Sequence, residues 1–132
     1  MNRLSGHITN IRVSGSMSLV TVKVATIELQ TIIIETPETA AYLKVDHPIH
    51  ILFKETEVVI GTDTEHAVSL TNKIKGSLAV IEKGSLLSKL TIESEVGNLI
   101  AIISSDAVRQ LDLQQNDTVI AMIKLNEIML SE

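Results

Sequence analysis

Few side chains in this 132-residue sequence could carry out chemistry by themselves. There are four histidines, of which only His47 and His50 lie close together, and neither of these recurs elsewhere in the chain. The absence of cysteine excludes thiolate nucleophiles, disulfides and thiolate-bound metals. No Ser/His/Asp order, glycine-rich phosphate loop or pair of carboxylates at a plausible cleft occurs in the sequence. We therefore expect neither an enzyme nor a protein that binds a metal cation.

The overall composition argues against nucleic acid and membranes as partners. The chain has 11 Lys and Arg against 16 Asp and Glu, a formal net charge of −5, and no run of basic residues. Tyr42 and Phe53 are its only aromatic side chains that could stack on bases. No window is apolar for long enough to cross a bilayer, and the first residues do not form a secretory signal. We therefore expect a cytoplasmic protein.

The sequence is a tandem repeat with an offset of 70 residues and no gap. Matching positions include Gly6 with Gly76, Lys54 with Lys124 and Glu57 with Glu127, and aliphatic residues replace one another in between. Two β-rich segments could share Ile and Val by composition alone, but composition does not align glycine, lysine and glutamate as well. We expect one domain over residues 1–62, a polar linker over 63–68 and a second domain over 69–132.

Each half is predicted to contain five short strands and one short helix. In the second half the strands are expected over 74–81, 86–92, 99–103, 118–123 and 127–130. Ser104-Ser105-Asp106 is expected to cap a helix carrying Ala107, Val108 and Leu111, and Thr36-Pro37 to begin the corresponding helix in the first half. The fold class is therefore mainly β, with two small five-stranded barrels resembling the oligonucleotide/oligosaccharide-binding (OB) fold.

Units of this size are at the lower limit of independent stability. A domain of about 60 residues buries only about 60% of the surface that its unfolded chain exposes. Two copies on one chain gain burial by sharing apolar faces, and association with further chains gains more. We therefore expect an obligate oligomer, such as a homo-trimer of tandem domains or another closed oligomer.

Both halves resemble the molbindin, or Mop, family, the TOBE-type domain of molybdate-binding proteins. The family's opening signature, Ser-Ala-Arg-Asn-x-x-x-Gly, is similar to residues 69–76, SLTNKIKG. Its closing segment, Lys-Ala-Thr/Ser-Glu-Val-Met, is similar to residues 54–59, KETEVV, and 124–129, KLNEIM. Its Ile-Thr-x-x-Ser-Val-x-x-Leu stretch is similar to residues 103–111, ISSDAVRQL. These motifs occur in the family's order and extend over almost the whole chain.

The resemblance implies that a tetrahedral oxyanion, molybdate or tungstate, binds at interfaces between domains, without an organic cofactor. A dianion held without a metal or an arginine cluster needs several converging N–H and hydroxyl donors and a positive charge. The candidate binding residues are those of the opening and closing segments together with a serine before the second helix: Ser69, Thr71, Lys124, Asn126, Lys54, Thr56 and Ser104.

Each of these candidates also has a structural interpretation. The lysines could protect exposed strand edges, Ser69 and Thr71 could form a turn, and Ser104 could cap the helix. The chain also departs from the family pattern, because Thr71 replaces the arginine, Asn126 replaces a hydroxyl residue, and nothing in the first half corresponds to Ser69. We therefore expect fewer or weaker sites than in a relative that matches fully.

Three functions are compatible with these features. The first is the binding of molybdate or tungstate for storage or homeostasis. The second is a stand-alone ligand-sensing or protein-interaction module related to molybdate-responsive regulators or transporter ATPases. The third is a scaffold whose barrels have lost the site and bind only protein. Molybdate and tungstate share charge and geometry, so the sequence does not choose between them.

Overall fold

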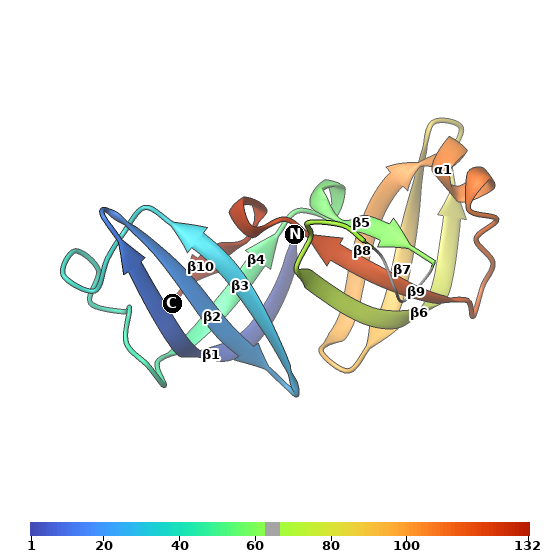
Figure 1. The fold of residues 1–132 in the computed structure, drawn as a ribbon. Helices are drawn as coiled ribbons and strands as arrows, with labels where there is room; N and C mark the ends of the chain where they lie inside the picture. Colours follow the sequence, from blue (N-terminus) through green and yellow to red (C-terminus); the bar gives the residue numbers. More distant parts are fainter. Residues whose placement is uncertain (63–66) are drawn as a thin grey trace.

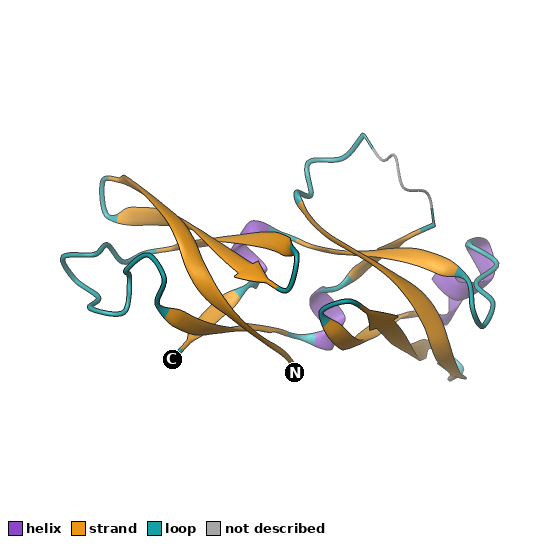
Figure 2. Cartoon of the chain, turned by 90° about the horizontal axis from the view of Figure 1, so that it is seen from below, coloured by secondary structure: helices purple, strands orange, loops and turns teal. Residues whose placement is uncertain are grey.

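The computed structural model describes residues 1–62 and 67–132, so residues 63–66 of the expected linker lie outside the described part. The chain forms two β units side by side, which give an elongated molecule (Figures 1 and 2). The first half contains β1 (Asn2–Ser14), β2 (Met17–Val24), β3 (Ile27–Ile33), β4 (Pro48–Phe53), the 3-10 turn η1 (Glu55–Glu57) and β5 (Val59–Gly61). The second half contains β6 (Asn72–Lys83), β7 (Leu87–Ser94), β8 (Gly97–Ser104), α1 (Ser105–Gln110), β9 (Thr118–Ile123), the 3-10 turn η2 (Leu125–Glu127) and β10 (Met129–Ser131).

The two antiparallel sheets have matching strand orders, β10-β4-β1-β2-β3 and β5-β9-β6-β7-β8. Their registers also match at the offset of 70, because Asn2 pairs with Phe53 while Asn72 pairs with Ile123. Each long first strand has an irregularity at the same place, between Ile8 and Asn10 in β1 and between Leu78 and Val80 in β6. The mainly β fold with two five-stranded units, predicted from the sequence, is confirmed.

The last strand of each half belongs to the sheet of the other half. β5 pairs with β9, with Ile60 opposite Ala121, and β10 pairs with β4, with Leu130 opposite Ile51. The C-terminus consequently lies on the first sheet (Figure 1). In the sequence, these segments simply close their own halves, since a repeat pattern does not reveal which neighbouring sheet a strand joins. The exchange ties the two units together through main-chain hydrogen bonds.

A single aliphatic cluster runs through both units. Inward-facing residues alternate with exposed ones along the strands, as expected for sheets with one face turned to water. Val58 and Ile128, which follow the two 3-10 turns, are each 3% exposed and belong to the same buried cluster. The apolar residues around the exchanged strands thus join the two cores, which agrees with the expectation that small units share apolar faces.

Two buried asparagines hold the halves together at equivalent positions. The Asn72 side chain accepts a hydrogen bond from the Gln30 N–H (2.7 Å) and donates one to the Gln30 carbonyl (2.8 Å). Asn2 makes the same pair of bonds with the backbone of Ile100, both at 2.8 Å. Gln30 and Ile100 lie on β3 and β8, the outermost strands of the two sheets. Each asparagine therefore satisfies backbone groups on the edge strand of the opposite half.

The helix expected after Thr36 in the first half is not formed. Residues 37–42 make turns instead, in which the N–H groups of Thr39 and Ala40 both donate to the Thr36 carbonyl at 2.9 Å. Thr39 also accepts a hydrogen bond from the Thr36 N–H through its hydroxyl, as at a helix start, but the next bond, from the Leu43 N–H to the Ala40 carbonyl, spans only three residues and the helix is not continued. The Tyr42 hydroxyl donates to Glu35 (2.7 Å) and so anchors this loop. Burial, and to a smaller extent this hydrogen bond, raises the pKa of Tyr42 to about 12.

The helix of the second half does form, and Ser104 caps it as predicted. The Ser104 hydroxyl accepts a hydrogen bond from the Ala107 N–H at 3.0 Å. The neighbouring Ser105 is buried and bonds to the Gly84 carbonyl and to the Ser88 hydroxyl, both at 2.8 Å. These bonds fix the start of α1 to the β6–β7 connection. The first half has no serine at the equivalent place, where Glu35 follows Ile34.

Replacing Asn72 by alanine is expected to lower the free energy of unfolding by about 2 kcal/mol, because it leaves the Gln30 N–H and carbonyl without their partners. The measurement is urea unfolding at one fixed protein concentration, followed by far-UV circular dichroism. Asn98→Ala is the matched control, since Asn98 is an exposed strand residue, and it should change stability by no more than about 0.5 kcal/mol. Equal effects of the two substitutions would show that the buried contact contributes nothing.

Candidate functional site

The closing segments of the two halves have the same backbone structure. Lys54 and Lys124 precede η1 and η2 with nearly equal torsions, φ −73° and ψ 149° against φ −69° and ψ 147°. In each turn the glutamate N–H donates to the lysine carbonyl at 3.0 Å. The side chains of Lys54, Thr56, Lys124 and Asn126 are all exposed. In Figure 1 the two turns, green for η1 and red for η2, lie near the middle of the molecule, where the sheets meet.

In the second half, the sheet brings the opening and closing segments together. Asn72 is opposite Ile123 at the end of the β6–β9 ladder. The next residues outward, Thr71 and Lys124, therefore flank the same end of this ladder, with exposed Ser69 two positions before Thr71. Four of the seven candidates, Ser69, Thr71, Lys124 and Asn126, thus belong to two adjoining segments. We call this group the η2 site.

In the first half, the closing segment meets the other half instead. η1 packs against β8, and Thr56 and Ser104 line one hollow of about 410 Å³. We call Lys54, Thr56 and Ser104 the η1 site. The rest of the hollow is aliphatic and includes the exposed side chains of Val59 and Leu111. The Ser104 hydroxyl caps α1 as an acceptor, so its own hydrogen could still be donated to a ligand. The start of α1 is not counted as a site, because the helix has only six residues.

Strand β3 holds both segments of the η2 site from the side. The backbone of Gln30 bonds to the side chain of Asn72, which directly follows the opening residues. The hydroxyl of the next residue, Thr31, contacts the Ile128 carbonyl at 2.7 Å and the Leu125 carbonyl at 3.1 Å, on either side of η2. Thr31 itself is only 1% exposed. The geometry of the η2 site therefore depends on a strand from the first half.

Two equivalent glutamates meet where the two turns approach each other. Partial desolvation, the nearby Glu127 carboxyl and its negative charge raise the pKa of Glu57, and the Lys54 ammonium opposes part of the change. A raised carboxyl pKa means that the protonated form is favoured in the folded protein. The two turns thus carry positive charge on their lysines and share a repulsive carboxylate pair.

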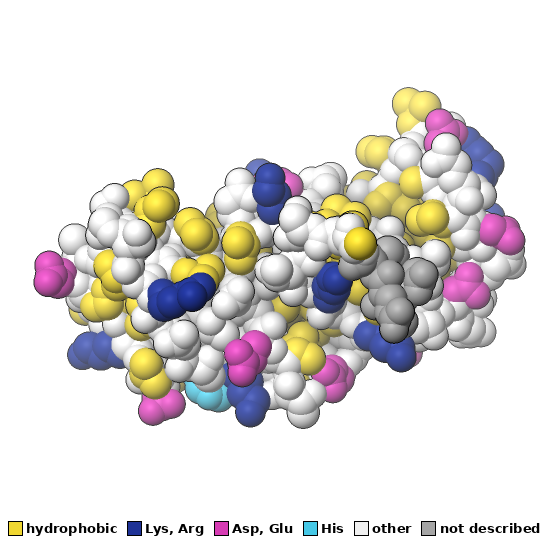
Figure 3. Space-filling view, in the orientation of Figure 1, with side chains coloured by type: hydrophobic (Ala, Val, Ile, Leu, Met, Phe, Trp, Pro, Cys, Tyr) yellow, Lys and Arg dark blue, Asp and Glu magenta, His cyan; other side chains and the backbone are white. Residues whose placement is uncertain are grey.

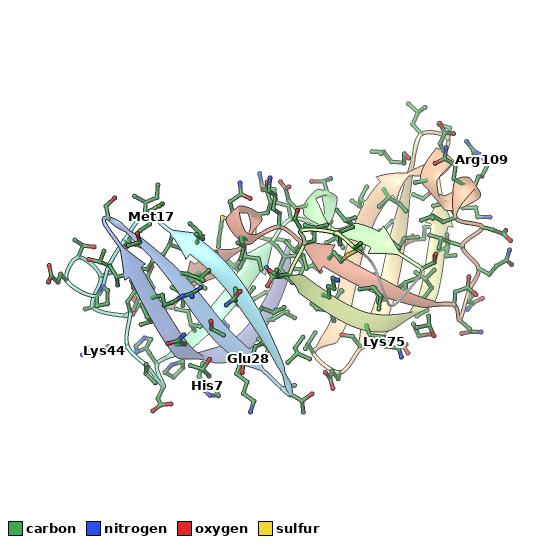
Figure 4. All side chains as sticks on the ribbon, in the orientation of Figure 1. His7, Met17, Glu28, Lys44, Lys75 and Arg109 are labelled. Carbon is green, nitrogen blue, oxygen red and sulfur yellow. The ribbon has the colours of Figure 1, made fainter. Side chains whose placement is uncertain are left out.

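Positive charge is otherwise dispersed over the surface. On the face shown in Figure 3, lysine and arginine side chains are scattered among acidic and apolar ones rather than gathered into a patch. In Figure 4, Lys44, Lys75 and Arg109 lie on a loop of the first half, on β6 and on α1, well apart from one another. A small anion bound near the turns would therefore rely on local donors, since no basic cluster is visible on this face.

Two of the histidines, His47 and His50, take structural contacts. Ser5 and His50 are hydrogen-bonded across β1 and β4 at 3.1 Å, and His47 lies 3.4 Å from the Glu132 carboxylate. Within residues 1–62 and 67–132, no three histidine, cysteine or acidic side chains are grouped so that they could hold a metal ion. In the same described part, no helix is long and apolar enough to cross a membrane.

Comparison with known proteins identifies the family. Residues 69–130 match the model of the TOBE domain. The molybdenum-pterin-binding protein 1 of Clostridium pasteurianum is 31% identical over 65 residues, which are 48% of this chain and 96% of that protein. The chain belongs to the molbindin (Mop) family of molybdate-binding proteins.

One solved structure shares the fold of almost the whole chain. The cytoplasmic molybdate-binding protein ModG, solved with molybdate bound, superposes with a TM-score of 0.88 over 98% of this chain and 94% of its own, at 18% identity, which shows a common fold. A molybdate-binding protein from Sporomusa ovata matches 51% of this chain and all of its own, at 30% identity and a TM-score of 0.49. These relatives are named as binding proteins and not as enzymes, as the sequence predicted.

Sequence reasoning missed the residues that position the candidates. Asn2 and Asn72 occupy equivalent positions in the repeat, so the alignment of the two halves carried a signal for this pair. Glu57 and Glu127 also matched, but nothing indicated that they touch. Thr31 gave no signal, because its counterpart is Ala101 and a buried threonine in a β-strand is unremarkable. Its role depends on which segment packs against β3.

Replacing Glu57 by glutamine should raise the melting temperature at pH 7 and leave it almost unchanged near pH 4. The folded-state pKa is raised, so the wild-type chain loses stability as the pH rises above the unfolded value of about 4.3, and glutamine removes this loss. Differential scanning calorimetry at both pH values measures the effect. The control is Glu82→Gln, which removes the same charge from an exposed strand position. A lower melting temperature at pH 7 would contradict the repulsion.

Proposed function

We propose that this protein binds molybdate or tungstate in the cytoplasm, for storage or homeostasis of the metal, at interfaces within an oligomer of tandem Mop domains. The observation that carries the proposal is the meeting of the opening and closing segments at the η2 site. The pairing of Asn72 with Ile123 brings the hydroxyl residues Ser69 and Thr71 to the ladder end that also carries Lys124. Membership of a molybdate-binding family supports the choice of ligand, and the cytoplasmic relative ModG supports the location.

The exposed groups suit a tetrahedral dianion. Hydroxyl groups and backbone N–H groups each donate one hydrogen bond, the lysine ammonium donates up to three and supplies positive charge, and the Asn126 amide adds two N–H donors. Charge-assisted hydrogen bonds of this kind are the strong ones. Phosphate is disfavoured when it carries a proton, because a donor that faces a P–OH group finds no acceptor. Sulfate is smaller, so cavity size separates it from molybdate.

Binding within an oligomer is supported by the apolar surroundings of the η1 site. Val59 is 46% exposed and Leu111 38% exposed, and both line the hollow that contains Thr56 and Ser104. A second copy of the chain that covers these aliphatic side chains would also enclose the two hydroxyl groups. Removal of water strengthens electrostatic contacts with an anion, so an interface is a better binding place than an open surface. A homo-trimer or another closed oligomer would complete the sites in this way.

The first test is thermal unfolding of the ligand-free protein at matched ionic strength with molybdate, tungstate, sulfate or phosphate. A ligand at about one hundred times its dissociation constant adds about 2.7 kcal/mol to the folded state, so molybdate and tungstate should raise the melting temperature by several degrees. Sulfate and phosphate should have little effect. The absence of a rise with any of the four anions would overturn the proposed function.

Replacing Lys124 by alanine should weaken the η2 site about tenfold or more, because it removes a charge-assisted contact. Isothermal titration with molybdate measures the change. The matched control is Lys83→Ala, which removes one positive charge from an exposed position at the end of β6, outside both sites. Equal affinity losses in the two variants would mean that net charge, and not a local contact, determines binding. Sedimentation velocity on the same samples tests for the closed oligomer.

A further inference from the structure

The two closing turns have the same backbone but are held differently. The Thr31 hydroxyl has one hydrogen, which it donates to the nearer Ile128 carbonyl at 2.7 Å, and the Leu125 carbonyl lies within reach at 3.1 Å, so this one group contacts η2 near both of its ends. The equivalent residue facing η1 is Ala101, which is fully buried and carries no hydroxyl. The carbonyls of η1 that correspond to those bound by Thr31 therefore have no side-chain donor at this position.

In the strand that packs against each turn, the difference in side-chain donors lies at one position of the repeat. β3 packs against η2, and β8 packs against η1. Each strand also bonds to a buried asparagine of the other half through the residue before Thr31 or Ala101, namely Gln30 or Ile100. The following residue is Thr31 on β3 and Ala101 on β8. The two halves thus agree in how they hold the segment before the long first strand, and differ in how they hold the lysine-bearing turn.

Thr31 acts on the residues that the η2 site needs. The two carbonyls that it binds flank Asn126, and Lys124 directly precedes Leu125. Its neighbour Gln30 binds Asn72, which follows Thr71. Two consecutive residues of β3 therefore hold the opening segment and the closing segment in one arrangement. A turn that is already ordered loses less conformational freedom when it binds a ligand, which improves affinity without a new contact to the ligand.

From this asymmetry we infer that Thr31 is a positioning residue which makes the η2 site the tighter of the two oxyanion sites, while Ala101 leaves the η1 site the weaker one. The inference rests on the proposed function. It adds that the two sites of a chain differ in affinity because of residues 31 and 101, which belong to neither site. Thr31 does not touch the anion in this scheme, since it is buried and both of its bonds go to backbone carbonyls.

The test uses two full-length backgrounds, each with one site weakened. Lys54→Ala weakens the η1 site, so that the η2 site dominates the titration, and Lys124→Ala weakens the η2 site, so that the η1 site dominates it. Thr31→Val is then added to each, since valine keeps the shape of threonine and removes the hydroxyl. Titration with molybdate should show about a five- to tenfold higher Kd in the Lys54→Ala background, as expected for the loss of one hydrogen bond, and no change in the Lys124→Ala background. Thr31→Ser should retain the affinity.

The reciprocal variant is Ala101→Ser, which offers a hydroxyl to η1. In the Lys124→Ala background it should lower the Kd for molybdate, and it carries the test alone if Thr31→Val does not fold. Equal shifts in both backgrounds, or no shift in either, would overturn the inference, because they would indicate a general structural role or none. If the wild-type chain binds no molybdate, the proposed function fails instead. If it binds molybdate and only the Lys54→Ala background does not, the η2 site is wrong and the inference with it.

Discussion

The structure depends on the exchange of the closing strands between the two halves. β5 completes the second sheet and β10 completes the first, so neither sheet is complete without residues from the other half. A unit of about 60 residues is at the lower limit of independent stability. The exchange solves this problem by merging the two cores and adding main-chain hydrogen bonds across the boundary. The candidate site residues lie beside these crossing points, because the closing turns immediately precede the exchanged strands.

Buried polar contacts reinforce the same boundary. An asparagine placed against an edge strand costs stability unless its amide is fully paired, and here both the oxygen and the nitrogen are used. Such contacts require one particular arrangement of the two halves, whereas aliphatic packing tolerates several. The arrangement matters for function, since the lysine of each half lies next to a strand of the other half. A rigid boundary therefore fixes the positions of the groups to which the proposed function assigns the anion.

Charged side chains of the two turns lie close together at the boundary. The chain is acidic overall, and the two central glutamates repel each other where the turns meet. The lysines of the turns offset part of this charge, and a dianion bound to them competes for the same positive groups. A proton held by the glutamate pair reduces the negative charge nearby.

The sequence by itself determined the repeat, the mainly β fold, the helix cap at Ser104, the family and the candidate residues. These properties follow from local patterns, namely alternation, turn chemistry and motifs that recur at one offset. The helix expected at Thr36 was wrong, because the chain makes one helix-like backbone bond there, from Ala40 to Thr36, and then turns. Only the tertiary structure decided which half each closing strand joins, which residues support each lysine and which carboxyls meet. Those contacts join residues about 60 to 100 positions apart, from Ile60 with Ala121 to Thr31 with Ile128, and no local pattern specifies a partner at that distance.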